Sequence, residues 1–152
     1  MTTVRRASLI ATLACSLLAI SASATQSAKF TVDKSDYSIK ESLTGQAGDP
    51  VKGRETAIDR KKGNCLACHT MPIPEQPFHG RIAPPLMGVG ARYTPAQLRL
   101  RVVNPKMLNP NTIMPSYYMS DGFHRTMKKF AGKTILSAQE VEDIIAYLST
   151  LK

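Results

Sequence analysis

Gly63-Asn64-Cys65-Leu66-Ala67-Cys68-His69 is the stretch that decides how the rest of the chain is interpreted. Two thiols separated by two residues, with a histidine directly after the second, are typical of a site where haem c is attached covalently. In one helical turn, Cys65 and Cys68 can both reach the vinyl groups of a single porphyrin and form thioethers with them. The imidazole of His69 then lies over the iron and can ligate it. The spacing therefore predicts one covalently bound haem c.

Two other interpretations of the same motif are a redox-active Cys-x-x-Cys pair and half of a zinc site. A redox pair usually lies at the strand-to-helix turn of a βαβ unit, and no such pattern surrounds Cys65. A structural zinc site needs four ligands, and only His79 and His124 remain to complete one. Histidines of this kind are more often loop or surface residues than metal ligands. Haem attachment is therefore the favoured interpretation.

The second axial ligand of the iron is expected among the seven methionines. Met71 is too close to His69 to reach the opposite face of a porphyrin, and Met87 belongs to a segment expected on the proximal side. Met114 lies in Asn109-Pro110-Asn111-Thr112-Ile113-Met114-Pro115, a loop whose prolines and asparagines oppose helix formation and can hold a thioether in place. We therefore predict Met114 as the axial ligand, with Met119 next and His124 third. The alternative role for any of these methionines is to fill gaps in the core.

Three helices are predicted around the motif, and no segment alternates strongly enough to predict a sheet. Asp49-Pro50 opens a helix expected to continue to about Lys62, where Gly63 stops it. Thr94-Pro95 opens a second, which ends at Asn104-Pro105. Ser137 and Glu140 form a capping box at the start of the last, whose apolar residues recur at helical spacing. The pattern predicts a small all-α haem domain in which the cofactor fills part of the core.

The first 24 residues have the features of a cleaved signal peptide. Arg5 and Arg6 precede an apolar run, residues 7–20, and Ala22-Ser23-Ala24 fits the small-x-small cleavage rule. The run is shorter than the ~20 residues needed to span a bilayer, so a retained anchor is the less favoured alternative. We expect residues 25–152 to be the mature chain, in the periplasm and without a membrane span. Of three cysteines, Cys15 would be lost with the signal peptide.

Several further motifs resemble class I cytochromes c, over about residues 48–152. In that fold the first and last helices cross where a glycine meets an aromatic residue, and Gly53 and Tyr147 are the matching positions. Ala83-Pro84-Pro85-Leu86 is similar to the family's Gly-Pro-x-Leu segment, with alanine in place of glycine. The resemblance implies that the Pro84 carbonyl accepts a hydrogen bond from His69, which fixes the tautomer of the ligand.

A narrower resemblance is to the SoxX family, the monohaem subunit of the SoxAX cytochrome of bacterial thiosulfate oxidation. It is carried by residues 83–93, 98–103, 111–117 and 141–148. The resemblance implies a heterodimer with a SoxA-type haem subunit, acting as an L-cysteine S-thiosulfotransferase. That enzyme couples thiosulfate oxidatively to a cysteine of a carrier protein and passes electrons to a downstream cytochrome. The catalytic haem of the family is on the other subunit, so no catalytic residue is expected in this chain, only electron relay.

Charge and chain length bear on the partners. The 152 residues carry a net charge of +9, and no acidic residue occurs between Glu75 and Asp121. The basic residues from Arg81 to Lys106 could form a solvated face or a collar that meets an acidic partner. Nucleic acid is not expected, because the chain is predicted to be exported and lacks aromatic residues interleaved with the basic ones.

Residues 25–47 carry no haem chemistry and are interpreted as an N-terminal extension. It could be a disordered tail or could lie over a partner subunit. The alternative function is a free soluble periplasmic cytochrome that shuttles electrons between a dehydrogenase and a terminal oxidase. The extension and the long insertion before the last helix favour the subunit of a complex.

Overall fold

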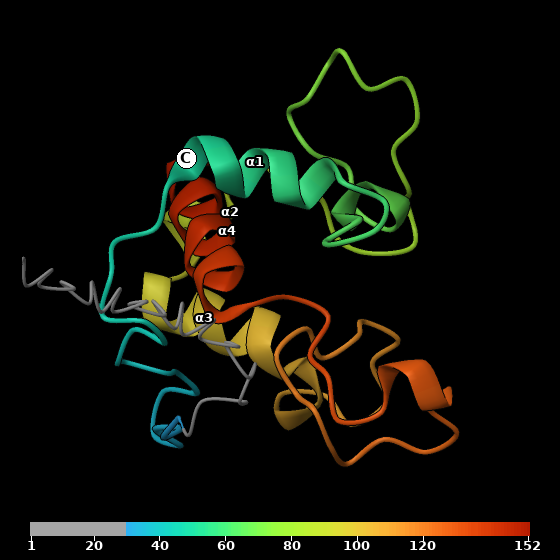
Figure 1. Ribbon diagram of the computed structural model, residues 1–152. Coiled ribbons are helices and arrows are strands. Elements are labelled where there is room, and N and C mark those ends of the chain that lie inside the picture. The colour runs from blue at the N-terminus through green and yellow to red at the C-terminus, as the bar shows by residue number, and fades with distance from the viewer. Residues whose placement is uncertain (1–29) are drawn as a thin grey trace, which may run out of the picture.

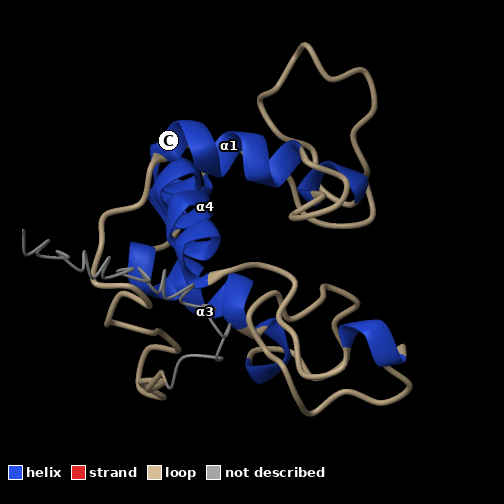
Figure 2. Ribbon diagram, viewed as in Figure 1, coloured by secondary structure: helices blue, strands red, loops and turns tan. Residues whose placement is uncertain are grey.

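The computed structural model describes residues 30–152, so the expected signal peptide lies outside the described residues. The α-helices are α1 (Pro50–Ile58), α2 (Val89–Arg92), α3 (Pro95–Val103) and α4 (Ala138–Thr150). Single 3₁₀ turns are η1 (Cys65–Ala67), η2 (Pro105–Met107) and η3 (Lys128–Phe130). Residues 30–152 contain no strand, only one isolated bridge between Asp33 and Ser38 (Figure 2). The predicted all-α fold is confirmed.

The first and last helices cross against each other and form the centre of the fold (Figure 1). Asp49 caps α1 by accepting hydrogen bonds from Val51 N and Lys52 N, and the Ser137–Glu140 capping box opens α4, as predicted. At the crossing, a Cβ on Gly53 would lie 1.9 Å from the carbonyl oxygen of Asp143. The close approach expected at Gly53 is therefore present. The nearest atoms are backbone atoms one turn before Tyr147.

Helix α1 is shorter than predicted, because it ends at Ile58 rather than near Lys62. Asp59 leaves the helical conformation, with ψ at 116°, and its carbonyl accepts hydrogen bonds from the backbone of Lys62 and Asn64. Gly63 N then donates to Thr56 O at 3.1 Å. This turn folds the chain back along the end of the helix. It delivers the cysteine motif to the interior instead of extending it into solvent.

The described part of the N-terminal extension, residues 30–47, packs on its own domain. Ile39 is fully buried; its N–H donates to Ala96 O at 3.0 Å and its carbonyl accepts from Arg99 Nη1 at 2.7 Å. Leu43 N donates to Glu142 Oε1 at 2.8 Å. These bonds connect the extension to α3 and α4. The alternative of a disordered tail therefore does not hold for residues 30–47.

Two long loop regions project from this helical centre on the same side of the molecule (Figure 1). The first, drawn in green, runs from the cysteine motif through residues 70–88. The second, drawn in orange, runs from η2 to the start of α4 and includes η3. Along the chain, α1 leads to the first region and α3 leads into the second, which ends at α4.

Candidate haem site

The cysteine motif forms a tight turn at the base of the first loop region. Asn64 adopts a left-handed conformation with φ at 47°, and the chain then enters η1. Backbone hydrogen bonds to Cys65 O from Cys68 N (3.2 Å) and His69 N (2.9 Å) close the turn. Neither cysteine forms a disulfide, and both line the same cavity. The turn thus presents the two sulfur atoms to one space.

The orientation of the His69 ring is set by a carbonyl from the proline-rich segment. His69 Nδ1 lies 2.6 Å from Pro84 O. A carbonyl oxygen can only accept, so Nδ1 carries the proton and Nε2 keeps its lone pair. Ala83 N donates to Cys68 O at 3.1 Å and Leu86 N to Thr70 O at 2.9 Å, on either side of Pro84. The segment is therefore tied to the motif at three points, and Nε2 is free to bind a metal.

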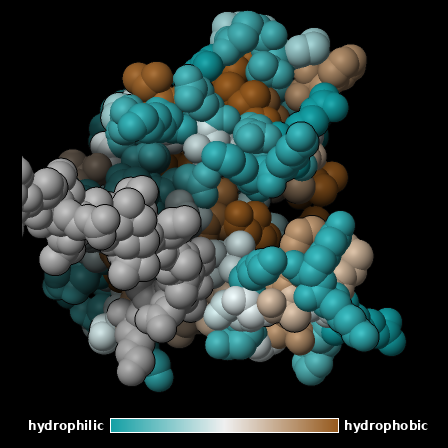
Figure 3. All heavy atoms as spheres, in the orientation of Figure 1, coloured by the Kyte–Doolittle hydropathy of each residue, from teal (hydrophilic) through white to brown (hydrophobic). Residues whose placement is uncertain are grey.

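A cavity of about 510 Å³ lies between the two loop regions and the bases of α3 and α4. Figure 3 shows apolar side chains at a hollow between these regions. The apolar wall residues are Leu86, Val89, Leu98, Val102, Leu108, Ile144 and Leu148. Cys65, Cys68, His69 and Met114 line the same cavity. A flat apolar group carrying two reactive vinyl positions and a metal fits this set of side chains.

Met114 alone of the candidate sixth ligands lines this cavity. Its loop is held by hydrogen bonds from Met114 N to Thr112 Oγ1 (3.2 Å) and from Lys106 Nζ to Thr112 O (2.9 Å). Met119 and His124 are not among the lining residues, and His124 is exposed. The geometry brings Met114 together with the cysteine motif and leaves both lower-ranked candidates outside.

The surroundings of the thiols do not suit the redox or zinc interpretations. Burial raises the pKa of Cys65 to about 11, whereas redox-active cysteines have lowered values. Within residues 30–152, no group of three or more His, Cys, Asp or Glu side chains could hold a metal ion. The Cys65 thiol is therefore kept protonated by its apolar surroundings, unlike the thiol of a redox-active pair.

Two arginines and two tyrosines also line the cavity and were not predicted as site residues. Arg92 donates to the carbonyls of Met87 (2.8 Å) and Pro85 (3.2 Å), next to Pro84. Arg101 stacks over the Tyr93 ring, with Cζ 3.7 Å from the ring centroid. Arg92 and Arg101 are therefore engaged within the fold and are not simply part of a solvated face. The sequence spacing of these arginines from the buried Leu98 and Val102 does not indicate whether an arginine side chain faces the cavity or the solvent.

Tyr117 is the second of these tyrosines, and it connects the two loop regions. Its hydroxyl donates to Gly63 O at 2.7 Å, just before the cysteine motif. Burial raises the pKa of Tyr117, so the hydroxyl keeps its proton and the bond. Because Tyr117 lies three residues after Met114, this bond fixes the methionine loop relative to the cysteine turn.

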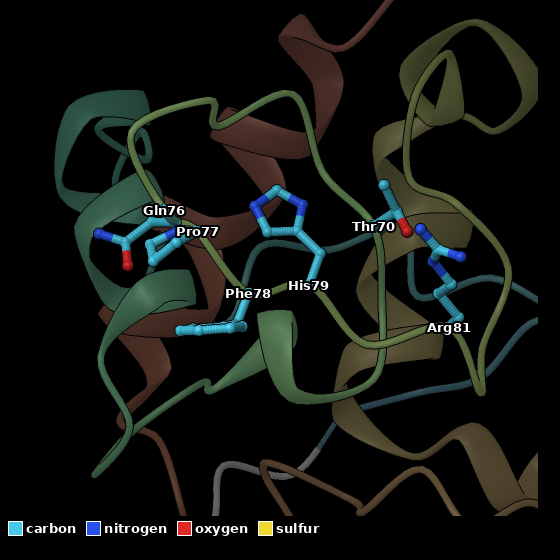
Figure 4. Close-up of a pocket in the computed structure, with 6 residues that line it drawn as sticks. All are labelled: Thr70, Gln76, Pro77, Phe78, His79 and Arg81. Atoms are coloured by element: carbon cyan, nitrogen blue, oxygen red, sulfur yellow. The ribbon is translucent and has the colours of Figure 1, made fainter.

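A second hollow is lined entirely by residues of the first loop region (Figure 4). Its lining includes Phe78, His79 and Arg81 but neither cysteine nor His69. Both nitrogens of the His79 ring are engaged: Nδ1 accepts from Met71 N at 3.2 Å, and Nε2 lies 3.2 Å from Ile73 O. His79 therefore ties the loop together, in keeping with the expectation that it is a loop histidine.

None of the helices in residues 30–152 has the length and hydropathy of a membrane-spanning helix.

The cytochrome c family model matches residues 51–152. None of the curated proteins matches the chain. Among solved structures, the chain is similar to the crystal structure of SoxXA from P. pantotrophus, with 41% sequence identity and a TM-score of 0.76. That match covers 84% of this chain and 98% of the other. The chain thus belongs to the cytochrome c family, which implies covalently bound haem c, and it is a SoxX-type cytochrome.

Proposed function

We propose that the cavity holds one haem c, attached through Cys65 and Cys68 and ligated at its iron by His69 and Met114. The observation that supports this most directly is that these four side chains line one apolar cavity, whereas Met119 does not. Haem bound there supplies one-electron chemistry. Bound by His69 and Met114, the group would have a raised reduction potential, because a methionine ligand beside a histidine favours the reduced iron.

Pro84 acts on the site through His69. Its carbonyl accepts the Nδ1 proton, and this bond keeps the ring in the orientation that directs Nε2 into the cavity. Arg92 holds the neighbouring carbonyls of Pro85 and Met87 and thereby limits the movement of Pro84. Backbone carbonyls of residues 84–87 therefore hold both the His69 ring and the Arg92 side chain in place.

We infer that the chain is the electron-relay subunit of a SoxAX-type L-cysteine S-thiosulfotransferase and is not catalytic alone. With Cys65 and Cys68 committed to haem, residues 25–152 contain no other thiol to act as a nucleophile. If His69 and Met114 both hold the iron, no ligand position would be left for a sulfur anion. Coupling of thiosulfate to the carrier protein's cysteine then takes place on a SoxA-type haem subunit, and this chain passes electrons to a downstream cytochrome.

The proposed organisation is a signal peptide over residues 1–24, an extension over 25–47 and a cytochrome c domain over 48–152. Export fits the chemistry, since bacterial haem c is attached outside the cytoplasm. We therefore place the mature chain in the periplasm, as one half of a heterodimer.

The test is reconstitution from purified subunits. Alone, the haem-loaded chain should accept electrons rapidly from small reductants and should form no thiosulfonate on the carrier protein. Adding the SoxA-type subunit should restore coupling, with the haem of this chain reduced during turnover. Coupling by the isolated chain at the full rate of the complex would overturn the proposal. Native purification without a second haem protein would favour the free electron shuttle.

A further inference from the structure

Residues 121–135, which we call the insertion loop, extend away from the fold although both ends are firmly held. On one side Tyr118 N donates to Val103 O at 3.4 Å, and on the other Leu136 N donates to Tyr117 O at 3.0 Å. Tyr118 and Leu136 are almost fully buried, at 2% and 1% exposure. Between these anchors every residue from 121 to 133 is exposed (orange in Figure 1). The loop is thus anchored at both ends, and residues 121–133 are not part of the core.

The insertion loop has a net positive charge. Its cations are Arg125, Lys128, Lys129 and Lys133, and Asp121 is the only acidic residue between Glu75 and Glu140. In the part of the chain that the structure describes, none of these four cations forms a salt bridge.

Three cations of the preceding stretch, in contrast, have partners inside the fold. Arg99 is paired with Glu142, Arg101 stacks on Tyr93, and Lys106 Nζ donates to Thr112 O. The insertion loop therefore presents four exposed cations without a carboxylate partner in the described residues, whereas Arg99, Arg101 and Lys106 of the preceding stretch are engaged within the fold.

Large apolar side chains are exposed among these cations. Phe123 is 41% exposed, Met127 59%, Phe130 51% and Ile135 48%. None of them lines the haem cavity, so the cofactor does not account for them. Lys129 Nζ lies 4.9 Å from the centroid of the Phe130 ring, which keeps an aromatic face and a positive charge side by side. The four lie within residues 123–135 and among charged side chains, and such a grouping, unlike scattered single residues, is a mark of an interaction surface.

We propose that the insertion loop is a docking surface for the acidic face of a partner protein. Aromatic residues, methionine and arginine are the types enriched at protein interfaces, and lysines at the rim steer an oppositely charged partner. A membrane surface suits the loop less well, because η3 is a single 3₁₀ turn and lacks the long apolar helix face that lies in a bilayer interface. The proposal depends on the exposed side chains of the loop and not on the identity of the axial ligands.

The first test is photo-crosslinking of the full haem-loaded protein in its native cells. Phe130→p-benzoylphenylalanine should crosslink to one protein, and mass spectrometry should place the crosslink in a peptide rich in Asp and Glu. Val51→p-benzoylphenylalanine, at another exposed apolar position, is the control and should not give this product. Crosslinks only to lipid or only to a second copy of this chain would overturn the proposal, as would the absence of any product above the control.

The second test is charge reversal, measured with the recombinant partner that the crosslink identifies. Lys128→Glu/Lys129→Glu/Lys133→Glu should lower the association rate at low ionic strength roughly tenfold or more, and high salt should remove the difference. A matched control changes the net charge equally at other exposed cations that form no salt bridge in the described residues: Lys34→Glu/Arg60→Glu/Lys61→Glu.

The control variant should retain most of the association rate. Equal effects of the two triple variants would contradict a localised docking surface. Loss of binding to phosphatidylglycerol–phosphatidylethanolamine vesicles in the loop variant, with no effect on the protein partner, would assign the loop to a membrane instead.

Discussion

Removal of the Glu142 carboxylate is expected to destabilise the whole domain, although the residue does not line the haem cavity. Glu142 Oε1 accepts from Arg99 Nε and Oε2 from Arg99 Nη2, each at 2.8 Å, and Leu43 N also donates to Oε1 at 2.8 Å. The Arg99 and Glu142 side chains are only 9% and 4% exposed. Glu142→Ala would leave the guanidinium buried with Ile39 O as its only acceptor. Breaking one side of a buried pair costs about 3–5 kcal/mol, a large part of the ~5–15 kcal/mol stability of a typical domain.

Urea unfolding of the haem-loaded protein, followed by far-UV circular dichroism, measures this loss. Glu55→Ala is the control, because Glu55 is exposed, and it should change the free energy of unfolding by less than about 0.5 kcal/mol. Arg99→Met combined with Glu142→Leu removes both charges and should recover much of the stability. A loss below about 1 kcal/mol for Glu142→Ala would refute the reasoning, since it would mean that the buried charge is solvated or paired elsewhere.

Two further perturbations test the helix crossing and the cap of α4. Gly53→Ala places a methyl group 1.9 Å from Asp143 O, so we expect a loss of about 1–3 kcal/mol or more by urea unfolding, against little change for the exposed Val51→Ala. Partial burial acts to raise the pKa of Glu140, but hydrogen bonds from Lys62 and the helix cap outweigh it and lower that pKa. The carboxylate therefore contributes stability above its unfolded pKa, near 4.3, that is lost as the pH falls through its lower folded pKa. Glu140→Gln should flatten the dependence of unfolding free energy on pH in that acidic range, and an unchanged slope would contradict this assignment.

Helix starts were predictable from the sequence, because capping is a local interaction. The pairs Asp49-Pro50 and Thr94-Pro95 and the Ser137–Glu140 box each cap the helix that they predict. The side chain and the backbone groups that it caps are at most three residues apart, so no long-range contact is needed to recognise it.

The end of α1 was not predictable in the same way. Residues 59–62 contain no glycine or proline, and helix propensity alone would extend the helix to Gly63. The chain turns at Asp59 because Gly63 is held by Thr56 O and by the hydroxyl of Tyr117, a residue 54 positions later. The burial of Arg99 was not predictable from the sequence either, because its sequence context is that of a surface cation. Its burial depends on Glu142 and on the N-terminal extension.

The cysteine motif and the methionine loop could be recognised because each carries its chemistry in a short stretch of chain. What the sequence left open was the choice among Met114, Met119 and His124, which lie within ten residues of one another. Only the fold separates them, since the hydrogen bonds at Thr112 and Tyr117 fix which of these side chains faces the cavity.

The most direct test of the central claim is the long-wavelength absorption band that methionine sulfur gives when bound to ferric haem. The purified protein should show this band. It should be absent from Met114→Ala and present in Met119→Ala, while both variants retain covalently bound haem. A band that survives in Met114→Ala and disappears in Met119→Ala would contradict the assignment of the cavity and of its axial ligand.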